Sequence, residues 1–179
     1  MDQKQEKTII KRVQAGDRDA YACLVDKYKG PVFNLAYRMT GSFQEAEDLA
    51  QETFLKAYAA ITRFDAKKRF FPWLYTISLN LIRNHLKRKR KVSSEILQDN
   101  ITGDDTGNPE NTVVRHQESE KLSRCLEKLP ADLREAVILR YYQELSFGDV
   151  AETLEISLSA AKMRVYRGLE KLRSFMKDK

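Results

Sequence analysis

The amino-acid sequence predicts an all-α protein made of two small helical domains joined by a flexible linker. Apolar residues recur three and four positions apart along most of the 179 residues, which is the spacing of one helix face, and no segment alternates convincingly with period two. Residues 93–114 interrupt this spacing with Gly, Pro, Asn and scattered acids, a composition typical of flexible linkers. We therefore expect one domain over residues 1–92 and a second over residues 115–179.

Turn-forming and capping residues divide the first domain into helices. Asp17 is expected to cap one helix, and Gly30-Pro31 is expected to end it. A second helix then runs as far as Gly41. Ser42 and Glu45 have the spacing of a capping box at the start of a third helix. Its inward stripe consists of residues at helical spacing: Ala46, Leu49, Ala50, Thr53, Ala57 and Ile61.

The outward face of this third helix is acidic. Asp48, Gln51 and Glu52 lie on it, together with Leu55. A solvated surface would explain the charge, and acids near a helix N-terminus also complement the helix dipole. A docking surface for a separate partner is the functional interpretation, because acidic and basic residues are segregated along the chain.

An aromatic segment followed by a basic one, FFPWLYTISLNLIRNHLKRKRK at residues 70–91, predicts a fourth helix. At about 100° per residue, a core stripe would contain Leu74, Ile77, Leu81 and His85. A second line along the helix flank carries a ring, two amides and several cations, which are the groups that bind single-stranded nucleic acid. Its members are Trp73, Asn80, Asn84 and Lys87, and Arg83 lies beside it.

Two other interpretations of the fourth helix stay open. Trp73 is also explained as a core residue, with the basic tail as a solvated helix end whose charges suit the C-terminal dipole. A helix that lies on a membrane surface is disfavoured, because its apolar residues are not segregated from Asn80 and Asn84 as an interfacial helix requires.

The second domain has the pattern of a helix-turn-helix unit. Residues 122–129 mark one helix, and Pro130 begins another. Ser146 and Asp149 form a capping-box pattern for a short helix, and Ile156 fills the turn before the last helix. That last helix is expected to bury one stripe: Leu158, Ala161, Val165, Leu169 and Leu172.

The opposite face of the last helix has small residues first and cations behind them. A recognition helix needs this order, because its N-terminal end enters the major groove while Arg and Lys reach base edges or phosphates. The candidate residues are Ser159, Ala160, Lys162, Met163, Arg164 and Arg167. A plain amphipathic helix that closes a small bundle is the alternative.

Several other classes of protein are not expected. No run approaches the roughly 18 to 20 apolar residues of a membrane span, and the N-terminus is too polar for a secretory signal, so we expect a cytoplasmic protein without membrane insertion. No phosphate loop, histidine pair or nucleophile with a base at motif spacing indicates an enzyme, a metal site or a cofactor. Cys23 and Cys125 are far apart and are expected to be buried thiols.

Three segments, taken in order, resemble the signatures of bacterial extracytoplasmic-function sigma factors, the small members of the sigma-70 family. They are AEDLAQETFLKAY, FFPWLYTISLNLIRNHLKRKRK and LPADLREAVILRYYQELSFGDVAETLEISLSAAKMRVYRGLEKLR. The resemblance covers nearly the whole chain, with the linker in the expected place. It implies a factor that binds RNA polymerase core and directs promoter-specific transcription initiation, while catalysis belongs to the polymerase.

The resemblance also implies roles for the candidate residues. The flank from Trp73 to Arg88 matches the part that melts the proximal promoter element and holds the non-template strand. The recognition helix matches the reader of the distal element as duplex DNA. Other implied partners are the flap of the second-largest polymerase subunit and an anti-sigma factor. The segment that docks on the clamp coiled coil of the largest subunit is matched by Asp48, Gln51, Glu52 and Phe54.

Two positions depart from the family pattern. Members commonly have Gly where this chain has Glu155 and Thr where it has Ala160, so the resemblance does not imply the base preference at the distal element. Ala160 and Met163 could contact thymine methyl groups instead. The competing interpretation is a regulator that uses its helix-turn-helix on duplex DNA and its first domain for dimerisation. Such a regulator needs neither the flank that begins at Trp73 nor the acidic face.

Overall fold

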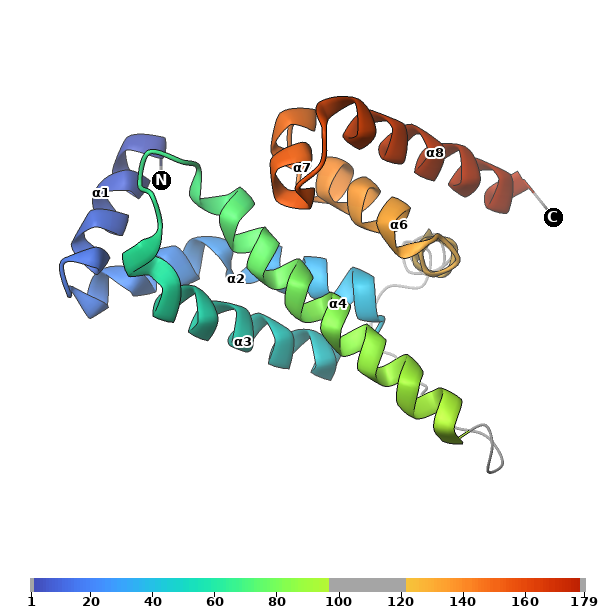
Figure 1. Ribbon diagram of the computed structural model, residues 1–179, viewed down its shortest axis with the longest axis horizontal. Coiled ribbons are helices and arrows are strands. Elements are labelled where there is room, and N and C mark those ends of the chain that lie inside the picture. The colour runs from blue at the N-terminus through green and yellow to red at the C-terminus, as the bar shows by residue number, and fades with distance from the viewer. Residues whose placement is uncertain (1, 97–121, 178–179) are drawn as a thin grey trace, which may run out of the picture.

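The structure of the protein is a computed structural model (Figure 1). All of its regular secondary structure, within the residues that it describes, is helical. The structure describes residues 2–96 and 122–177, and these ranges contain no strand, which confirms the all-α prediction. Residues 93–96, which were assigned to the linker, form the end of the fourth helix, and residues 97–114 lie outside the described ranges. Residues 122–127 are helical. The other helices are α1 (Gln3–Gln14), α2 (Arg18–Thr40), α3 (Phe43–Ala60), η1 (Ile61–Arg63), α4 (Phe70–Ile96), α6 (Ala131–Val137), η2 (Ile138–Tyr142), α7 (Phe147–Leu154) and α8 (Leu158–Lys177).

α2 is one continuous helix, so the prediction that Gly30-Pro31 separates two helices was wrong. A proline inside a helix removes one backbone hydrogen bond. Packing outweighs this local cost, because α2 contacts both α3 and α4 along its length. The buried face continues on both sides of Pro31 and includes Leu24, Tyr28, Val32, Leu35 and Ala36.

Ser42 caps α3 as predicted, but Glu45 does not complete a capping box. The Ser42 hydroxyl accepts a hydrogen bond from the Glu45 backbone N–H at 3.4 Å. The Glu45 carboxylate instead accepts a hydrogen bond from Lys89 Nζ at 2.6 Å and so links α3 to α4. The predicted inward stripe of α3 is buried throughout: Ala46, Leu49, Ala50, Thr53, Ala57 and Ile61.

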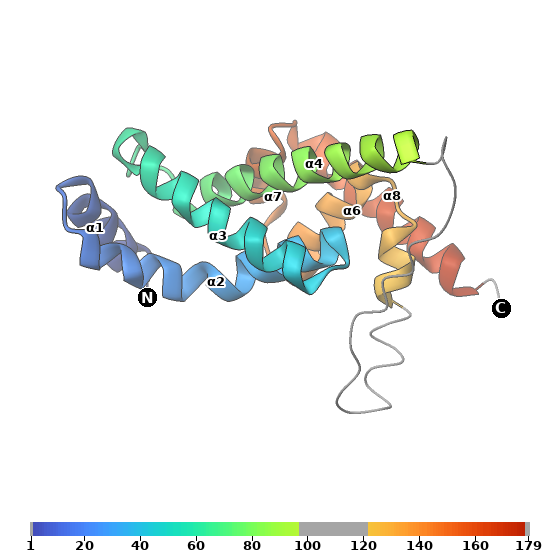
Figure 2. The same ribbon diagram turned by 90° about the horizontal axis from the view of Figure 1, so that it is seen from below.

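α4 is buried over a wider surface than the predicted stripe. Leu74 and Leu81 are buried, whereas Ile77 and His85 are only half-buried. Helices α2 and α3 lie on one side of α4 (Figure 2), and α7 of the second domain also packs on it. A helical wheel of α4 alone could not predict the burial that α7 adds. The additional buried residues are Phe70, Tyr75, Ser78, Leu79 and Ile82.

α7 and α8 form the predicted helix-turn-helix. Ser146 Oγ accepts a hydrogen bond from Asp149 N at 3.1 Å, and Asp149 Oδ2 accepts one from Ser146 N at 3.2 Å, which confirms the capping box. Glu155 ends α7 with φ of 55°, in the left-handed region that favours glycine. α8 then crosses α6 so closely at Gly168 that a Cβ there would lie 2.5 Å from Val137 Cγ2.

Two residues that were expected to be buried are exposed. Cys23 lies on the exposed side of α2, next to the buried Leu24, whereas Cys125 is buried as predicted. Leu158 is 49% exposed because it is the first residue of α8, and burial on that helix begins at Ala161.

The two domains pack against each other around one continuous hydrophobic core. Ile138 and Leu139 of η2 are wholly buried in it, and η2 contacts α2 of the first domain. α8 packs on α6 and α7 and lies farther from α4 than they do (Figure 1). The fold therefore places the flank of α4 close to the second domain and keeps α8 at its outer side.

Candidate polymerase and nucleic-acid interfaces

The predicted docking residues lie along α3, and most of them are exposed. Asp48, Gln51 and Glu52 are exposed, and Leu55 beside them is 71% exposed. We call these four residues the docking face. Phe54 differs, because it is only 9% exposed and packs in the core between α2 and α3. The docking face is therefore a polar edge with one exposed apolar side chain.

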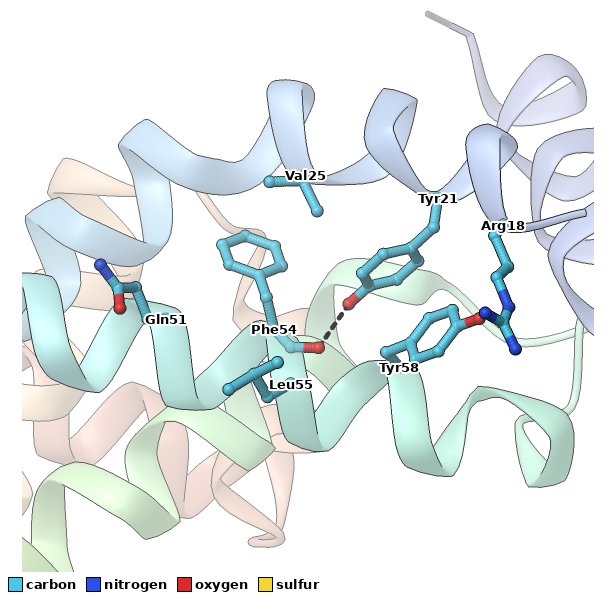
Figure 3. A pocket seen from close by; sticks show the side chains of 7 residues that line it. All are labelled: Arg18, Tyr21, Val25, Gln51, Phe54, Leu55 and Tyr58. Atoms are coloured by element: carbon cyan, nitrogen blue, oxygen red, sulfur yellow. Dashed lines mark hydrogen bonds between the residues drawn. The ribbon is translucent and has the colours of Figure 1, made fainter.

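An apolar pocket of about 560 Å³ lies between α2 and α3, next to the docking face (Figure 3). Tyr21 Oη donates a hydrogen bond to the Phe54 backbone oxygen at 2.7 Å, and its ring centroid lies 4.9 Å from that of Tyr58. Burial raises the pKa of Tyr21, so its hydroxyl remains a donor. The pocket is lined by Arg18, Tyr21, Val25, Gln51, Phe54, Leu55 and Tyr58.

Sequence reasoning did not assign the α2 side of this pocket to a site. Tyr21 and Val25 were not among the candidate residues. The sequence did contain one signal for the pocket. Leu55 is an apolar residue on an otherwise polar helix face, and such a residue indicates contact with another helix or with a partner. The partner helix α2 could be identified only from the tertiary structure.

The predicted single-strand residues on α4 mostly face outward. Asn80, Arg83, Asn84, Lys87 and Arg88 are all exposed. Trp73 is half-buried, and its ring centroid lies 4.8 Å from that of Phe64 and 5.4 Å from that of Phe70. The indole thus packs on the core with one part and keeps another part accessible. We call these six residues the strand flank.

Arg83, in the middle of the strand flank, is engaged by the second domain. Its Nε and Nη2 atoms donate to Glu135 Oε1 and Oε2 at 2.8 and 2.6 Å. The hydrogen bonds with Glu135 raise the pKa of Arg83 above its usual value. Asn80 Oδ1 lies 3.4 Å from Arg83 Nη1, a long contact that leaves the amide available to other partners.

The basic tail of α4 is anchored to α3 through Glu45. Lys89 Nζ and His85 Nε2 lie 2.6 and 2.9 Å from the two carboxylate oxygens of Glu45. Burial acts to raise the pKa of Glu45, but the hydrogen bond from Lys89 and the nearby His85 outweigh burial and lower that pKa. Lys87 and Arg88 remain exposed on the outer side of the same helix.

The recognition face of α8 is open to solvent along most of its length. Ser159, Lys162, Met163 and Arg167 are exposed, whereas Ala160 and Arg164 are half-buried. Arg164 turns toward α6, where its Nε lies 3.9 Å from an Asp132 carboxylate oxygen. The face therefore centres on residues 159, 162, 163 and 167 rather than on Arg164.

Tyr166 also lies on this face, and sequence reasoning missed it. Its side chain is 56% exposed, and its ring centroid lies 6.0 Å from that of Phe147 in α7. The signal was present in the sequence, because Tyr166 follows Ser159 by seven residues, which is two helical turns. An exposed aromatic ring on a recognition helix can contact thymine methyl groups.

The groups that these surfaces present are suited to binding. Within residues 2–96 and 122–177, no three His, Cys, Asp or Glu side chains are arranged to hold a metal ion. None of the helices described there is long and apolar enough to cross a membrane. The surfaces offer a polar edge beside an apolar pocket, a flank with a ring and amides, and a helix face with cations.

Comparison with known protein families agrees with this division into surfaces. The family model for sigma-70 region 2 matches residues 24–92, and the model for sigma-70 region 4 matches residues 119–172. The first match contains the docking face and the strand flank. The second contains the recognition face.

Curated relatives match over almost their whole length. The chain is 36% identical to the ECF RNA polymerase sigma factor SigW of Bacillus subtilis, over 96% of this chain and 97% of the relative. It is 33% identical to the RNA polymerase sigma-H factor of Pseudomonas aeruginosa, over 94% of this chain and 92% of the relative.

Two solved structures have the same fold. CnrH in complex with the cytosolic domain of CnrY matches with a TM-score of 0.73 at 23% identity, over 97% of this chain and 98% of that chain. RpoE of Bartonella quintana in complex with the anti-sigma factor NepR matches with a TM-score of 0.72 at 23% identity, over 88% of this chain and 97% of that chain. With both family models and full-length relatives in agreement, the chain belongs to the sigma-70 family, as an alternative sigma factor of the extracytoplasmic-function group that directs transcription initiation.

Proposed function

We propose that this sigma factor binds RNA polymerase core through the docking face of α3, and that its contact there is the clamp coiled coil of the largest subunit. The observation that carries the proposal is the exposed edge of Asp48, Gln51 and Glu52 beside an apolar pocket. Basic residues of a coiled coil would meet the carboxylates, and an apolar side chain of the same partner would enter the pocket over Leu55. Phe54 contributes from below, as part of the pocket wall.

The strand flank and the recognition face would then divide the promoter between them. The strand flank of α4 holds the separated non-template strand at the proximal element, with Trp73 stacking, Asn80 and Asn84 reading bases, and Lys87 and Arg88 binding phosphates. The recognition face of α8 reads the distal element as duplex DNA through the major groove. The domains are residues 1–92 and 115–179, and the flap of the second-largest subunit contacts the second of them.

Regulation by an anti-sigma factor is part of the proposal. The structural relative RpoE of Bartonella quintana is known in complex with the anti-sigma factor NepR. A partner of the same class would hold this chain away from the polymerase in the cytoplasm. A regulator that acts on duplex DNA without polymerase is not favoured, since it would have no use for the docking face.

Charge reversal on the docking face tests the proposal. The double variant Asp48→Arg with Glu52→Arg should lose binding to purified polymerase core in a pull-down and lose transcription, because both carboxylates would become repulsive to a basic partner. Both residues are exposed, so the fold should stay intact by circular dichroism.

A matched control distinguishes the effect of where the charges are reversed from the effect of the changed net charge. Glu152→Arg with Glu170→Arg changes the net charge equally at two exposed positions of the second domain and should keep core binding. Normal transcription by the Asp48 and Glu52 double variant would refute the docking assignment. Promoter-duplex binding by a chain that never associates with core would favour the competing regulator.

A further inference from the structure

The aromatic ring of the strand flank rests on two other rings. The ring centroid of Trp73 lies 4.8 Å from that of Phe64 and 5.4 Å from that of Phe70. The Phe64 and Phe70 centroids lie 5.6 Å apart, edge to face. Both phenylalanines are buried, whereas Trp73 is half-buried. The orientation of the indole therefore depends on where these two buried rings lie.

Phe64 directly follows η1, a single turn of three residues. The Phe64 backbone N–H donates to the Ile61 backbone oxygen at 3.1 Å and so closes this turn. A 3-10 turn has poorer hydrogen-bond geometry than an α-helix, and so short a piece stabilises itself weakly. The position of the Phe64 backbone therefore depends on contacts from outside the turn.

Gln14, the last residue of α1, binds this turn at both ends. Its side-chain Nε2 donates one hydrogen bond to the Ile61 backbone oxygen at 2.8 Å and another to the Phe64 backbone oxygen at 2.7 Å. A side-chain amide has two N–H donors, so Gln14 uses both of them here. α1 lies against η1, at the end of the first domain (Figure 1). Gln14 thus fixes the backbone that carries the Phe64 ring, across 50 residues of sequence.

The end of α1 that carries Gln14 is itself anchored to α2. Arg12 Nη2 donates to Asp17 Oδ2 at 2.6 Å, and Asp17 Oδ1 caps α2 by accepting a hydrogen bond from the Ala20 backbone N–H at 3.1 Å. The chain turns between the two helices at Gly16, whose φ of 98° lies in the left-handed region that favours glycine. Gln14 therefore reaches η1 from a fixed position.

The first half of α1 supports the other ring beneath Trp73. Glu6 is buried, and its carboxylate accepts hydrogen bonds from Tyr28 Oη at 2.5 Å and from Lys27 Nζ at 2.6 Å. The Tyr28 ring centroid lies 5.6 Å from that of Phe70. Burial raises the pKa of Tyr28, so its hydroxyl keeps the proton that it donates. Contacts from α1 thus lead to both rings on which the indole packs.

We propose that Gln14 is a positioning residue for promoter opening, because it sets the position of the Phe64 ring and, through that ring, of the Trp73 indole. The family model for sigma-70 region 2 begins at residue 24, so α1 lies outside the matched segment that contains the strand flank. The proposal rests on the proposed function of Trp73 as the stacking residue. Its consequence is that loss of the Gln14 amide misplaces the indole while the docking face on α3 and the recognition face on α8 keep their functions.

Two substitutions remove the hydrogen bonds that Gln14 donates. Gln14→Leu keeps the approximate size of the side chain, and Gln14→Glu keeps its shape, so the second variant remains informative if the first folds poorly. The matched control is Thr53→Val, which deletes another hydrogen bond from a side chain to a backbone oxygen in the same domain. Thr53 Oγ1 donates it to the Leu49 oxygen at 2.7 Å.

The position of the indole is measured on the free full-length chain. Trp73 is the one tryptophan of the sequence, so intrinsic fluorescence reports its surroundings directly. Both Gln14 variants should shift the emission maximum and increase quenching by acrylamide, whereas Thr53→Val should match the unmodified chain. Chemical unfolding of the same samples shows which variants are folded under the assay conditions.

Promoter opening is measured with each protein bound to purified polymerase core, on a duplex selected from a random pool with the polymerase-bound protein. Both Gln14 variants should reduce opening by about fivefold relative to Thr53→Val, which is the lower end of the effect of losing a stacking side chain. Duplex loading should stay normal. Adding Gln14→Leu to Trp73→Ala should cause no further loss, because Gln14 acts through Trp73.

Three outcomes would overturn the proposal. Fluorescence of both Gln14 variants equal to that of the unmodified chain would show that Gln14 does not position the indole. Altered fluorescence with the same opening as the Thr53→Val control would show that this position does not matter for opening. A loss from Gln14→Leu that adds in full to the loss from Trp73→Ala would assign the defect to general destabilisation.

Failure of the proposed function has a separate signature. Normal opening by Trp73→Ala alone would refute the stacking role of Trp73, whatever the fluorescence of the Gln14 variants shows. If the docking face is misassigned, the pull-down of the Asp48 and Glu52 double variant changes, and the fluorescence of the Gln14 variants does not.

Discussion

α4 and α8 both carry exposed cations and small polar groups, yet the two helices are packed differently. α4 is packed by α2 and α3 and also by α7, and its Arg83 is bound to Glu135. α8 is packed by α6 and α7 of its own domain, and most of its recognition face is exposed. The proposed duplex-reading surface of α8 is therefore free of contacts with the first domain at most of its residues, whereas the proposed strand flank of α4 has one residue, Arg83, held by the second domain.

The two helices are also held by different kinds of contact. α4 is held by large side chains, such as Phe70 and Leu74, which are almost fully buried. α8 is held by a close backbone approach at Gly168, where added volume would collide with Val137. α4 therefore depends on the volume of its buried side chains, whereas α8 depends on one position having no side chain.

The largest effect is expected at this close approach. Gly168→Ala should destabilise the protein by about 3 kcal/mol in chemical unfolding, because its Cβ must displace Val137 in a closely packed core. The double variant with Val137→Ala should recover part of the loss, which a double-mutant cycle would record as a coupling of about 1 kcal/mol. If the losses of stability from the two single substitutions were simply additive, the contact between Gly168 and Val137 would not be what holds α8 on α6.

Duplex reading by α8 gives the next effect. Arg167→Ala should weaken binding to a distal-element duplex, selected from a random pool with the polymerase-bound protein, by about 2 kcal/mol if Arg167 reads a base. Lys171→Ala is the control, since it should weaken binding to selected and scrambled duplexes alike. If Arg167→Ala also acts equally on both duplexes, Arg167 contacts only phosphate.

Substitution in the proposed strand flank of α4 should have a smaller effect, and the effect should appear at promoter opening rather than at duplex loading. Asn80→Ala should impair promoter opening by about 1.5 kcal/mol while duplex loading stays normal, because the amide meets a base only after the strands separate. Opening is compared on a fully duplex template and on one with a mismatched proximal element. A defect that is equal on both templates at low salt and absent on both at high salt would indicate general electrostatics instead of base capture.

The smallest effect concerns the turn that leads into α8. Glu155→Gly should stabilise the protein by about 1 kcal/mol in thermal unfolding, because glycine adopts the left-handed conformation of Glu155 without steric cost. Glu155→Ala serves as the control, since it removes the charge and keeps the strain. Stabilisation by Ala as large as that by Gly would assign the effect to the charge of Glu155 near Arg83.

Features that depend on neighbouring residues in the chain were predictable. The capping box of Ser146 and Asp149 and the cap at Asp17 follow from side chains that reach backbone N–H groups a few residues away. The buried stripe of α3 follows from helical periodicity. The exposure of Asp48, Gln51 and Glu52 follows as the complement of that stripe.

Features that depend on distant residues were not predictable in the same way. Gly30-Pro31 favours a break locally, but α2 stays continuous because α1, α3 and α4 pack against its buried face. Glu45 fits a capping box locally, but Lys89 and His85 bind its carboxylate from α4. In both cases a tertiary contact outweighs a local preference. That preference is about 3 kcal/mol for the proline inside α2 and about 1 kcal/mol for the cap of α3.

By itself, the sequence determined the helical class of the protein and most of the polar and apolar faces of its helices, from which the proposed polymerase, strand and duplex surfaces were chosen. These properties depend on periodicity and residue chemistry, which are local. Only the tertiary structure decided that Tyr21 and Phe54 join in one pocket and that Glu135 binds Arg83 across 52 residues of sequence. The reason is physical, since each such contact depends on how two helices pack, and packing is set by the whole core rather than by either segment.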